Sequence, residues 1–417
     1  MQLAADREAW PWGKRTVQLV PVGEADSSKR HKLLCDLRTS ERVKPSVKEK
    51  TDDELLKHYL LAKGPHLTNL GILCIGQQHQ RADLTGAPVV QFLKYDQQGQ
   101  KIKKLVWDDH TLGPMELIES VWRDIPDFQE RYELPDGLYR QHVPAFDEVV
   151  VRELLVNAIV HRPCTQRGDI FLNMHPDRLE VVNPGLLPMG VTPQNILHTS
   201  VRRNDQLARL FHDLRLMERE GSGFDRIFEV LLSQGRPTPE LVEGDDRVRV
   251  IIQRRILKPA VIDFIAKADE TYQLTQRERI ALGLLAQHDA LTAREFNVLL
   301  ELATAEMLQP WIKRLLQWGL VKSAGRTKST RYFVDPRLLH DLSFVGDTTL
   351  KRIEPHRLAA LLVEDIVRYP GSKIGDIHQR IGIEIPRSRI RRAMEQLVKT
   401  GKLVPVGTRS GTRYALP

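Results

Sequence analysis

Residues 149–161, Val-Val-Val-Arg-Glu-Leu-Leu-Val-Asn-Ala-Ile-Val-His, decide the central part of the fold. Their spacing predicts a helix, because apolar residues cover most of the surface while Glu153, Asn157 and His161 recur every four residues. Side chains four residues apart stack along one face of a helix. This stripe is either the polar side of an ordinary amphipathic helix or a row of functional groups.

Two strands and two glycine-containing turns follow this helix. Residues 168–173 and 179–183 are predicted to pair as a hairpin, after which Pro184-Gly185 begins a loop. Further on, Gly221-Ser222-Gly223 precedes a predicted helix over 224–232. Glycines at the start of a helix let backbone N–H groups approach a phosphate closely, although the same string is also a common turn.

This combination resembles the Bergerat-fold (GHKL-type) ATP-binding domain shared by gyrase, the mismatch-repair ATPases, sensor histidine kinases and heat-shock chaperones. It is closer to one divergent branch, the RecG-like or Schlafen-associated bacterial proteins that are predicted transcriptional regulators. The resemblance spans about residues 50–255. It is carried by the segments 67–73, 152–161, 177–188, 203–204 and 220–223.

The resemblance implies roles for individual residues toward ATP and Mg²⁺. Glu153 would act as the catalytic base that orients a water, Asn157 would hold Mg²⁺, and His161 would lie near the phosphates. The family's D-x-G-x-G motif, whose aspartate contacts adenine, is replaced by Asn183-Pro184-Gly185. An amide can also bond adenine, because it both donates and accepts. The other residues that the resemblance implies for nucleotide binding are Gly185, Arg203, Asn204, Gly221, Ser222 and Gly223. For Arg203 and Asn204, the start of a capped helix is an equally good interpretation.

The end of the chain contains a repeat. Five residues recur with a constant offset of 82: Gly319, Gly325, Thr330, Arg331 and Tyr332 return as Gly401, Gly407, Thr412, Arg413 and Tyr414. The repeat predicts one module used twice, over 257–345 and 350–417. Each copy has a pattern of three helices and a hairpin, which resembles a winged helix-turn-helix. The predicted fold class is therefore α+β: a Bergerat-like sandwich with helices on one face of a mixed sheet, followed by tandem winged helix-turn-helix domains.

Positive charge is concentrated in the second copy. The whole chain has a formal charge of +8, and residues 354–417 alone hold 12 Lys or Arg against 6 Asp or Glu. Such clustering favours binding to double-stranded DNA, with a solvated face or a protein-docking module as the alternative. The candidate DNA contacts are Arg387, Arg389, Arg391, Arg392, Arg409 and Arg413 in the second copy and Arg326, Lys328 and Arg331 in the first.

The remaining chain divides into three regions. Residues 1–66 are expected to be a strand and linker region, at most a fragment of an Alba-like domain, with the basic stretch 27–53 a solvated linker rather than a nucleic-acid arm. Residues 67–146 are expected to form an α/β subdomain with strands at 89–95 and 101–107. Residues 147–256 would be the ATP-binding core.

Several functional classes are excluded. Cys35, Cys74 and Cys164 form no CxxC pair, which excludes a disulfide scaffold and a cysteine-rich zinc site. No apolar run has the length of a membrane span and no signal peptide is visible, so a cytoplasmic protein without membrane contact is expected. No GxxxxGK[ST] string is present, which excludes a P-loop helicase.

The favoured hypothesis is an ATP-binding, DNA-binding regulator, in which the nucleotide pocket modulates DNA binding by the winged helices. A homodimer is expected as well, because such regulators commonly bind paired half-sites. Two alternatives stay open. One is an ATPase that drives a DNA transaction, such as mobile-element or phage-defence work; the other is a scaffold that binds DNA or protein and no nucleotide.

Overall fold

The computed structural model describes residues 12–84, 86–136, 139–199, 201–217, 223–256, 260–288, 290–302, 305–325, 330–335, 338, 355–382, 385–406 and 412–416. Within these ranges, none of the helices has both the length and the apolar character that crossing a lipid bilayer requires.

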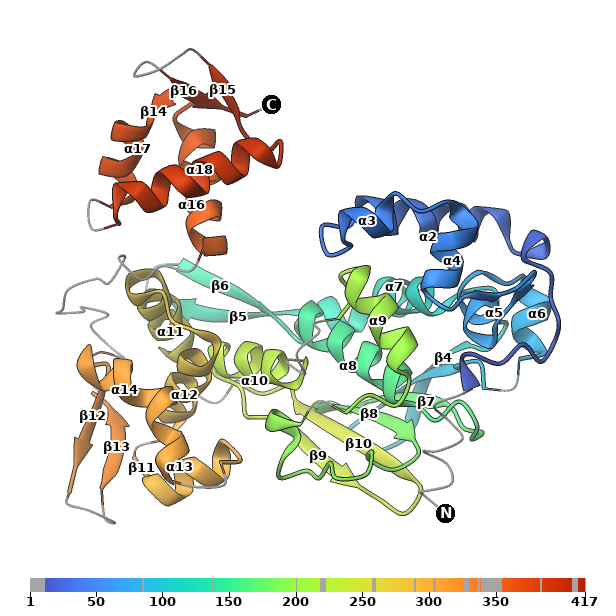
Figure 1. Cartoon of the computed structure of the whole chain (residues 1–417). Helices are drawn as coiled ribbons and strands as arrows, with labels where there is room; N and C mark the ends of the chain where they lie inside the picture. The colour runs from blue at the N-terminus through green and yellow to red at the C-terminus, as the bar shows by residue number, and fades with distance from the viewer. Residues whose placement is uncertain are drawn as a thin grey trace.

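A mixed six-stranded sheet forms the centre of the body (Figure 1). The neighbours β3 and β7 are parallel, and the other neighbouring pairs are antiparallel. In spatial order the strands are Lys101–Trp107 (β4), Val90–Tyr95 (β3), Ile170–Met174 (β7), Arg178–Pro184 (β8), Arg247–Gln253 (β10) and Glu240–Glu243 (β9). The strands predicted for this region are thus present, while β9 completes the sheet as an edge strand that the sequence did not indicate.

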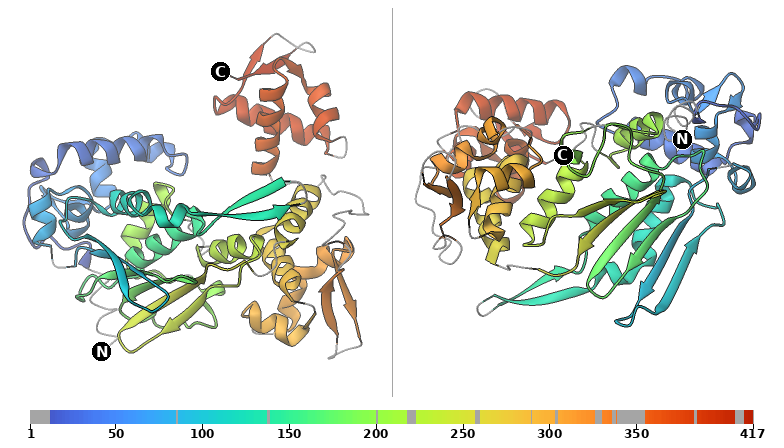
Figure 2. Two further views of the ribbon diagram at one scale, coloured as in Figure 1. Left: turned by 180° about the vertical axis from the view of Figure 1, so that it is seen from behind. Right: turned by 90° about the horizontal axis from the view of Figure 1, so that it is seen from below.

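Helices cover one face of this sheet (Figure 2). The helix predicted from the deciding stretch is α8. Its apolar residues are buried apart from Val149 in the first turn, while Asn157 and His161 remain half-buried. Its neighbours on this face are Pro114–Asp124 (α7), Asp205–Asp213 (α9) and Gly223–Ser233 (α10), and α8 itself spans Glu148–His161. The α+β class with helices against a mixed sheet is therefore confirmed.

The N-terminal region corrects one prediction. The stretch expected to be a solvated linker folds as the helices Ser27–Thr39 (α2), Pro45–Lys48 (α3) and Asp52–His58 (α4). Burial of their leucines stabilises these helices. The buried leucines are Leu33, Leu34, Leu37, Leu55 and Leu56. The charges that suggested a linker pair between the helices instead, with Arg38 Nη2 2.7 Å from Asp52 Oδ1 and Arg30 Nη2 3.2 Å from Asp53 Oδ1. Residues 17–22 contribute a bridge from Pro21 to His66 before the short 3₁₀ helix Val22–Glu24 (η1), so the strand expected in this region is not formed there.

Several short elements surround the sheet and were not predicted. They are Ala62–Lys63 (β1), His66–Leu67 (β2), Gln78–Ala82 (α6), Pro126–Gln129 (η2) and a separate hairpin of Arg131–Asp136 (β5) and Tyr139–Pro144 (β6). The helix Asn69–Ile75 (α5) also lies in this part of the chain, and every one of its residues is buried.

The tail contains the same order of elements twice. The first copy comprises Gln276–Gln287 (α12), Leu291–Thr292 (β11), Ala293–Leu299 (α13), Ala305–Leu308 (η4), Gln309–Gln317 (α14), Val321–Ala324 (β12) and Arg331–Val334 (β13), preceded by Ala260–Tyr272 (α11). The second comprises Pro355–Arg368 (α16), Ser372–Lys373 (β14), Ile374–Ile381 (α17), Arg387–Lys399 (α18), Val404–Val406 (β15) and Arg413–Ala415 (β16).

The registers of the two small sheets match the repeat. Arg331 lies opposite Thr292 and Arg413 opposite Lys373, so the first short strand of each copy joins its hairpin at the same place. Gly319 and Gly401 both have a φ near +70° and follow the third helix of their copies. The 82-residue offset therefore holds in the structure for the hairpin and the glycine before it, while the first short strand is offset by 81 residues.

The two copies differ in how they are attached. The first shares one continuous hydrophobic core with the body, whereas the second has its own core of Leu358, Leu362, Ile366, Ile377, Ile385, Ile390, Met394, Leu397 and Leu403. At the join, Gly283 of α12 lies so close to α10 that a Cβ there would be 2.7 Å from Cβ of Leu232. Beside it, Arg279 Nε lies 2.5 Å from the buried Glu229 Oε1. The first copy is thus built onto the body through α10.

Candidate functional site

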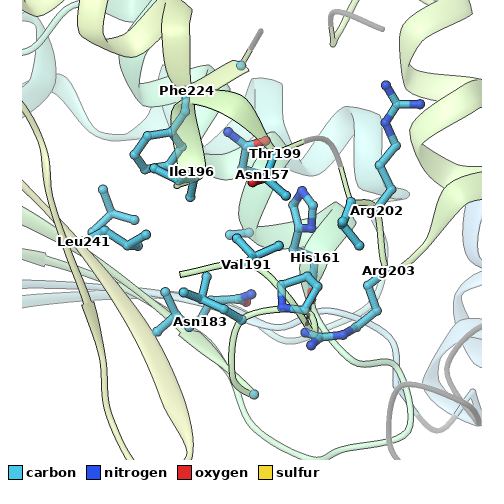
Figure 3. Close-up of a pocket in the computed structure, with 18 of the residues that line it drawn as sticks. Asn157, His161, Asn183, Val191, Ile196, Thr199, Arg202, Arg203, Phe224 and Leu241 are labelled. Atoms are coloured by element: carbon cyan, nitrogen blue, oxygen red, sulfur yellow. Dashed lines mark hydrogen bonds between the residues drawn. The ribbon is translucent and has the colours of Figure 1, made fainter. Parts of the chain in front are cut away.

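A cavity lies between α8, the strands β8, β10 and β9, and the loop from β8 to α9 (Figure 3). Its empty volume is about 940 Å³ when its open mouth is included. Most of its wall is apolar, with Leu154, Ala158, Val181, Val191, Ile196, Phe224, Leu241, Val248 and Val250 among the lining residues. A largely apolar cavity with a few convergent polar groups is the usual form of a small-molecule site.

Two of the three residues in the polar stripe of α8 line this cavity, and the third does not. Asn157 and His161 line it, whereas Glu153, one turn earlier, is buried with 8% of its surface exposed and is absent from the described lining. Glu153 instead lies beneath the start of α10. A Cβ on Gly223 would be 2.3 Å from Glu153 Oε1 and 3.3 Å from Asn157 Nδ2. A larger residue at 223 would have to displace the end of the Glu153 side chain, so Gly223 lets the start of α10 lie on both side chains.

His161 lies in a positive and dehydrated part of the wall. Burial, together with the positive charges of the nearby Arg203 and Arg202, lowers the pKa of His161 to about 4. Its Nδ1 is buried and has no hydrogen-bond partner among the described residues. At neutral pH the ring is therefore uncharged and offers a ring nitrogen toward the cavity, beside two guanidinium groups.

Asn183 occupies the position expected for base recognition. It is half-buried near the end of β8, lines the cavity, and its buried Oδ1 has no hydrogen-bond partner in the part of the chain that the structure describes. Gly185 also lines the cavity, with a φ of +86°, and a Cβ there would be 2.5 Å from Cγ of Pro163. The Asn183 amide therefore lies on the cavity wall, and the turn after it requires glycine at position 185.

The structure gives Arg203 and Asn204 anchoring roles. Arg203 donates to the carbonyl oxygens of His161 at 2.6 Å and Leu186 at 2.8 Å, and its side chain still borders the cavity. Asn204 is buried, does not line the cavity, and donates from Nδ2 to the carbonyl oxygens of Val160 and Arg162. Asn204 precedes α9, but its side chain makes no capping hydrogen bond there, so its amide anchors the end of α8 and does not cap the helix start.

Two polar lining residues were missed by sequence reasoning, Arg202 and Thr199. The Nε of Arg202 is buried without a hydrogen-bond partner among the described atoms, and Figure 3 shows the side chain rising beside His161. The only signal in the sequence is the Arg202-Arg203 pair, which does not reveal which arginine is tied to backbone. Gly221 and Ser222, also predicted to bind nucleotide, lie outside the described residues.

The described residues contain no cluster of three or more His, Cys, Asp or Glu side chains able to hold a metal. A metal bound by a full set of protein side chains is therefore not found in that part of the molecule. Mg²⁺ commonly takes only one or two protein oxygens and completes its shell with water and phosphate. The Asn157 side chain on the cavity wall, with the Glu153 carboxylate nearby, fits that smaller donor set.

Comparison with known proteins supports an ATPase-like domain here. Residues 168–252 match the family described as "Putative ATP-dependent DNA helicase recG C-terminal". Across 97% of its length the chain is also similar to a solved structure, the DIP2311 protein from Corynebacterium diphtheriae, of which 70% is covered. That pair shares 18% identity with a TM-score of 0.60, a likeness that concerns the fold alone. No curated protein matches the chain.

The candidate DNA-binding residues separate by copy. On α18, Arg387, Arg391 and Arg392 are exposed and Arg389 is half-buried. Arg413 is exposed on β16, where it donates to the carbonyl oxygen of Gly371, and Arg331 is exposed on β13. Arg326, Lys328 and Arg409 lie outside the described residues. Among the described candidates, the exposed arginines are thus Arg387, Arg391, Arg392 and Arg413 in the second copy and Arg331 in the first.

The low pKa of His161 predicts a specific decrease in stability in acid. The unfolded chain binds a proton at this residue below about pH 6.5, whereas the folded chain does so only near pH 4. Stability therefore falls as the pH drops through this window. We expect His161→Gln to reduce the stability difference between pH 7 and pH 5, measured by urea unfolding with the exposed His31→Gln as control. An equal pH dependence in His161→Gln and wild type would contradict the buried, neutral ring.

Proposed function

We propose that the chain is a regulator that binds ATP with Mg²⁺ in this cavity and binds double-stranded DNA with its second tail copy. The observation that carries the ATP part is the cavity itself. An amide-bearing helix, a glycine-started helix and two arginines meet there, beside a segment that matches an ATPase-like family. An open cavity also argues against the scaffold alternative, which requires a pocket filled by side chains.

The proposed arrangement of the nucleotide follows from the two ends of the cavity. Leu241, Val248 and Val250 make one end apolar, which suits a base, and the unsatisfied Asn183 amide adjoins it for polar recognition. The opposite end has Asn157, His161 and Arg202, which suit phosphates and their metal. Asn157 would hold Mg²⁺, and the arginine would offset the negative charge.

Bound Mg²⁺ would supply charge neutralisation and, in a hydrolase, polarisation of the terminal phosphate. The chain's own contribution to hydrolysis is less favourable. Glu153, the residue implied as the base, is buried against Gly223 rather than on the cavity wall. We therefore place ATP binding ahead of ATP turnover, and the ATPase alternative second.

The DNA part of the proposal rests on α18. Three helices with a three-stranded antiparallel sheet are the elements of a winged helix-turn-helix, whose third helix enters the major groove. In the second copy this helix is α18, and its exposed arginines lie at the first turns. Many exposed arginines on one helix provide phosphate contacts and release counterions on binding.

Among the described residues, the third helix of the first copy lacks this basic surface. By the 82-residue offset, the positions of Arg387, Arg389, Arg391 and Arg392 correspond to Ala305, Met307, Gln309 and Pro310. The exposed cation of α14 is Lys313, while Arg314 is half-buried and lies 3.1 Å from the buried Glu278. We therefore assign DNA binding to the second copy, in contrast to the expectation of two DNA-binding modules.

The ATP proposal predicts that Asn157→Ala weakens Mg²⁺-dependent ATP binding by at least about tenfold, because the variant no longer offers a polar group to the charged metal and phosphates. Calorimetric titration with and without Mg²⁺ measures this. Asn173→Ala is the matched control, since Asn173 pairs with Glu180 on the opposite face of the sheet. Unchanged affinity in Asn157→Ala would remove the metal assignment.

The DNA proposal predicts that replacing Arg387, Arg391 and Arg392 with alanine weakens binding to duplexes of any sequence. The slope of log affinity against log salt should become shallower by about 0.9 for each phosphate that the variant no longer neutralises. Fluorescence anisotropy at several salt concentrations measures both effects. Lys313→Ala on the equivalent helix of the first copy is the control and should leave both unchanged. Full binding by the triple variant would exclude α18 as the DNA-binding helix.

A further inference from the structure

The cavity wall is joined to the first tail copy by direct hydrogen bonds. The short helix Ile196–His198 (η3) lies in the loop from β8 to α9, and the side chain of Leu197 is buried. The Leu197 N–H donates to Glu301 Oε2 at 2.8 Å, and His198 Nε2 donates to the carbonyl oxygen of Leu300 at 2.7 Å. Both partners directly follow α13 of the first copy.

The same three-residue helix forms part of the cavity. Ile196 and the following Thr199 line it, on either side of the two residues that bond the first copy. The ring of His198 also lies edge-on to Trp311 of α14, with 6.2 Å between the ring centroids. A ligand that packs against Ile196 and Thr199 therefore contacts a segment whose backbone is fixed by the first copy.

Glu301 is an unusual residue for its position. It follows the end of α13 with a φ of +55°, a left-handed conformation that glycine or asparagine normally supplies at a helix end. The Leu302 N–H closes this turn on the carbonyl oxygen of Asn297 at 2.8 Å. At this position the Glu301 carboxylate reaches the Leu197 N–H, a contact that glycine could not make.

We propose that the first tail copy responds to ligand in the cavity through the η3–α13 contact, defined by Leu197, His198, Leu300 and Glu301, and does not bind DNA. This inference rests on the proposed ATP site and adds how that site is regulated. The contact holds Ile196 and Thr199 in place as cavity wall, so breaking it weakens ligand binding. By linkage, ligand binding strengthens the contact to the same degree.

Two substitutions at one position test the contact in the full chain. Glu301→Asn is too short to reach Leu197 but suits the left-handed backbone, so the fold is kept. Glu301→Gln keeps the length and an oxygen acceptor. We expect Glu301→Asn to weaken Mg-ATP binding about tenfold, as for removal of a hydrogen bond to a charged group, and Glu301→Gln to change it by less than about threefold. Calorimetric titration with Mg-ATP measures both.

A second measurement needs no nucleotide. Amide hydrogen exchange at Leu197 should be faster in Glu301→Asn than in wild type and nearly unchanged in Glu301→Gln. Duplex-DNA affinity without nucleotide should stay at the wild-type value in both variants, because the arginine-bearing helix belongs to the other copy.

The outcomes separate this inference from the proposed function. Wild-type Mg-ATP affinity and wild-type Leu197 exchange in Glu301→Asn would overturn the contact while leaving the ATP site intact. Failure of the wild-type chain itself to bind Mg-ATP would overturn the proposed function and the linkage with it. Weaker DNA binding in Lys313→Ala would overturn the statement that the first copy does not bind DNA.

Discussion

The architecture depends on two close approaches of backbone to side chain along α10, each allowed by a glycine. At its start, Gly223 lies on Glu153 and Asn157 of α8; at its end, Leu232 lies on Gly283 of the first tail copy. These two contacts fix both ends of α10 by close packing. Helix α10 therefore borders the cavity and also packs against the first tail copy. The ion pair between Glu229 and Arg279 is a second contact between α10 and that copy.

The two tail copies share one framework but differ in their surface charge and in their contacts with the body. The shared offset, sheet register and glycine positions preserve the module's framework, while the exposed residues of its third helix differ. Arginines face solvent on α18, whereas α14 buries Trp311 near the cavity loop and uses Arg314 to pair with Glu278. One core is continuous with the body and the other is separate. The first copy therefore has the contacts of an internal connector and the second has the charge of a nucleic-acid binder.

Much of the fold follows from local sequence patterns, whereas the site depends on long-range contacts. The α8 helix, the β7–β8 hairpin and the repeated tail were predictable from periodicity, capping and turn residues. The N-terminal helices were not, because a high density of charge masked leucines that pack only in the tertiary structure. Likewise, nothing local distinguishes Arg202 from Arg203, although one borders the cavity without a described partner and the other is tied to two carbonyls. The burial of Glu153 under Gly223 arises from residues 70 positions apart.

The most direct test of the account is an experimental structure of the full chain with Mg²⁺ and a non-hydrolysable ATP analogue at saturating concentration. We predict density for the metal at the Asn157 side chain, phosphates toward Arg202, and the base at the Asn183 and Val250 end of the cavity. An empty cavity under those conditions, or an analogue bound elsewhere on the chain, would contradict the central claim.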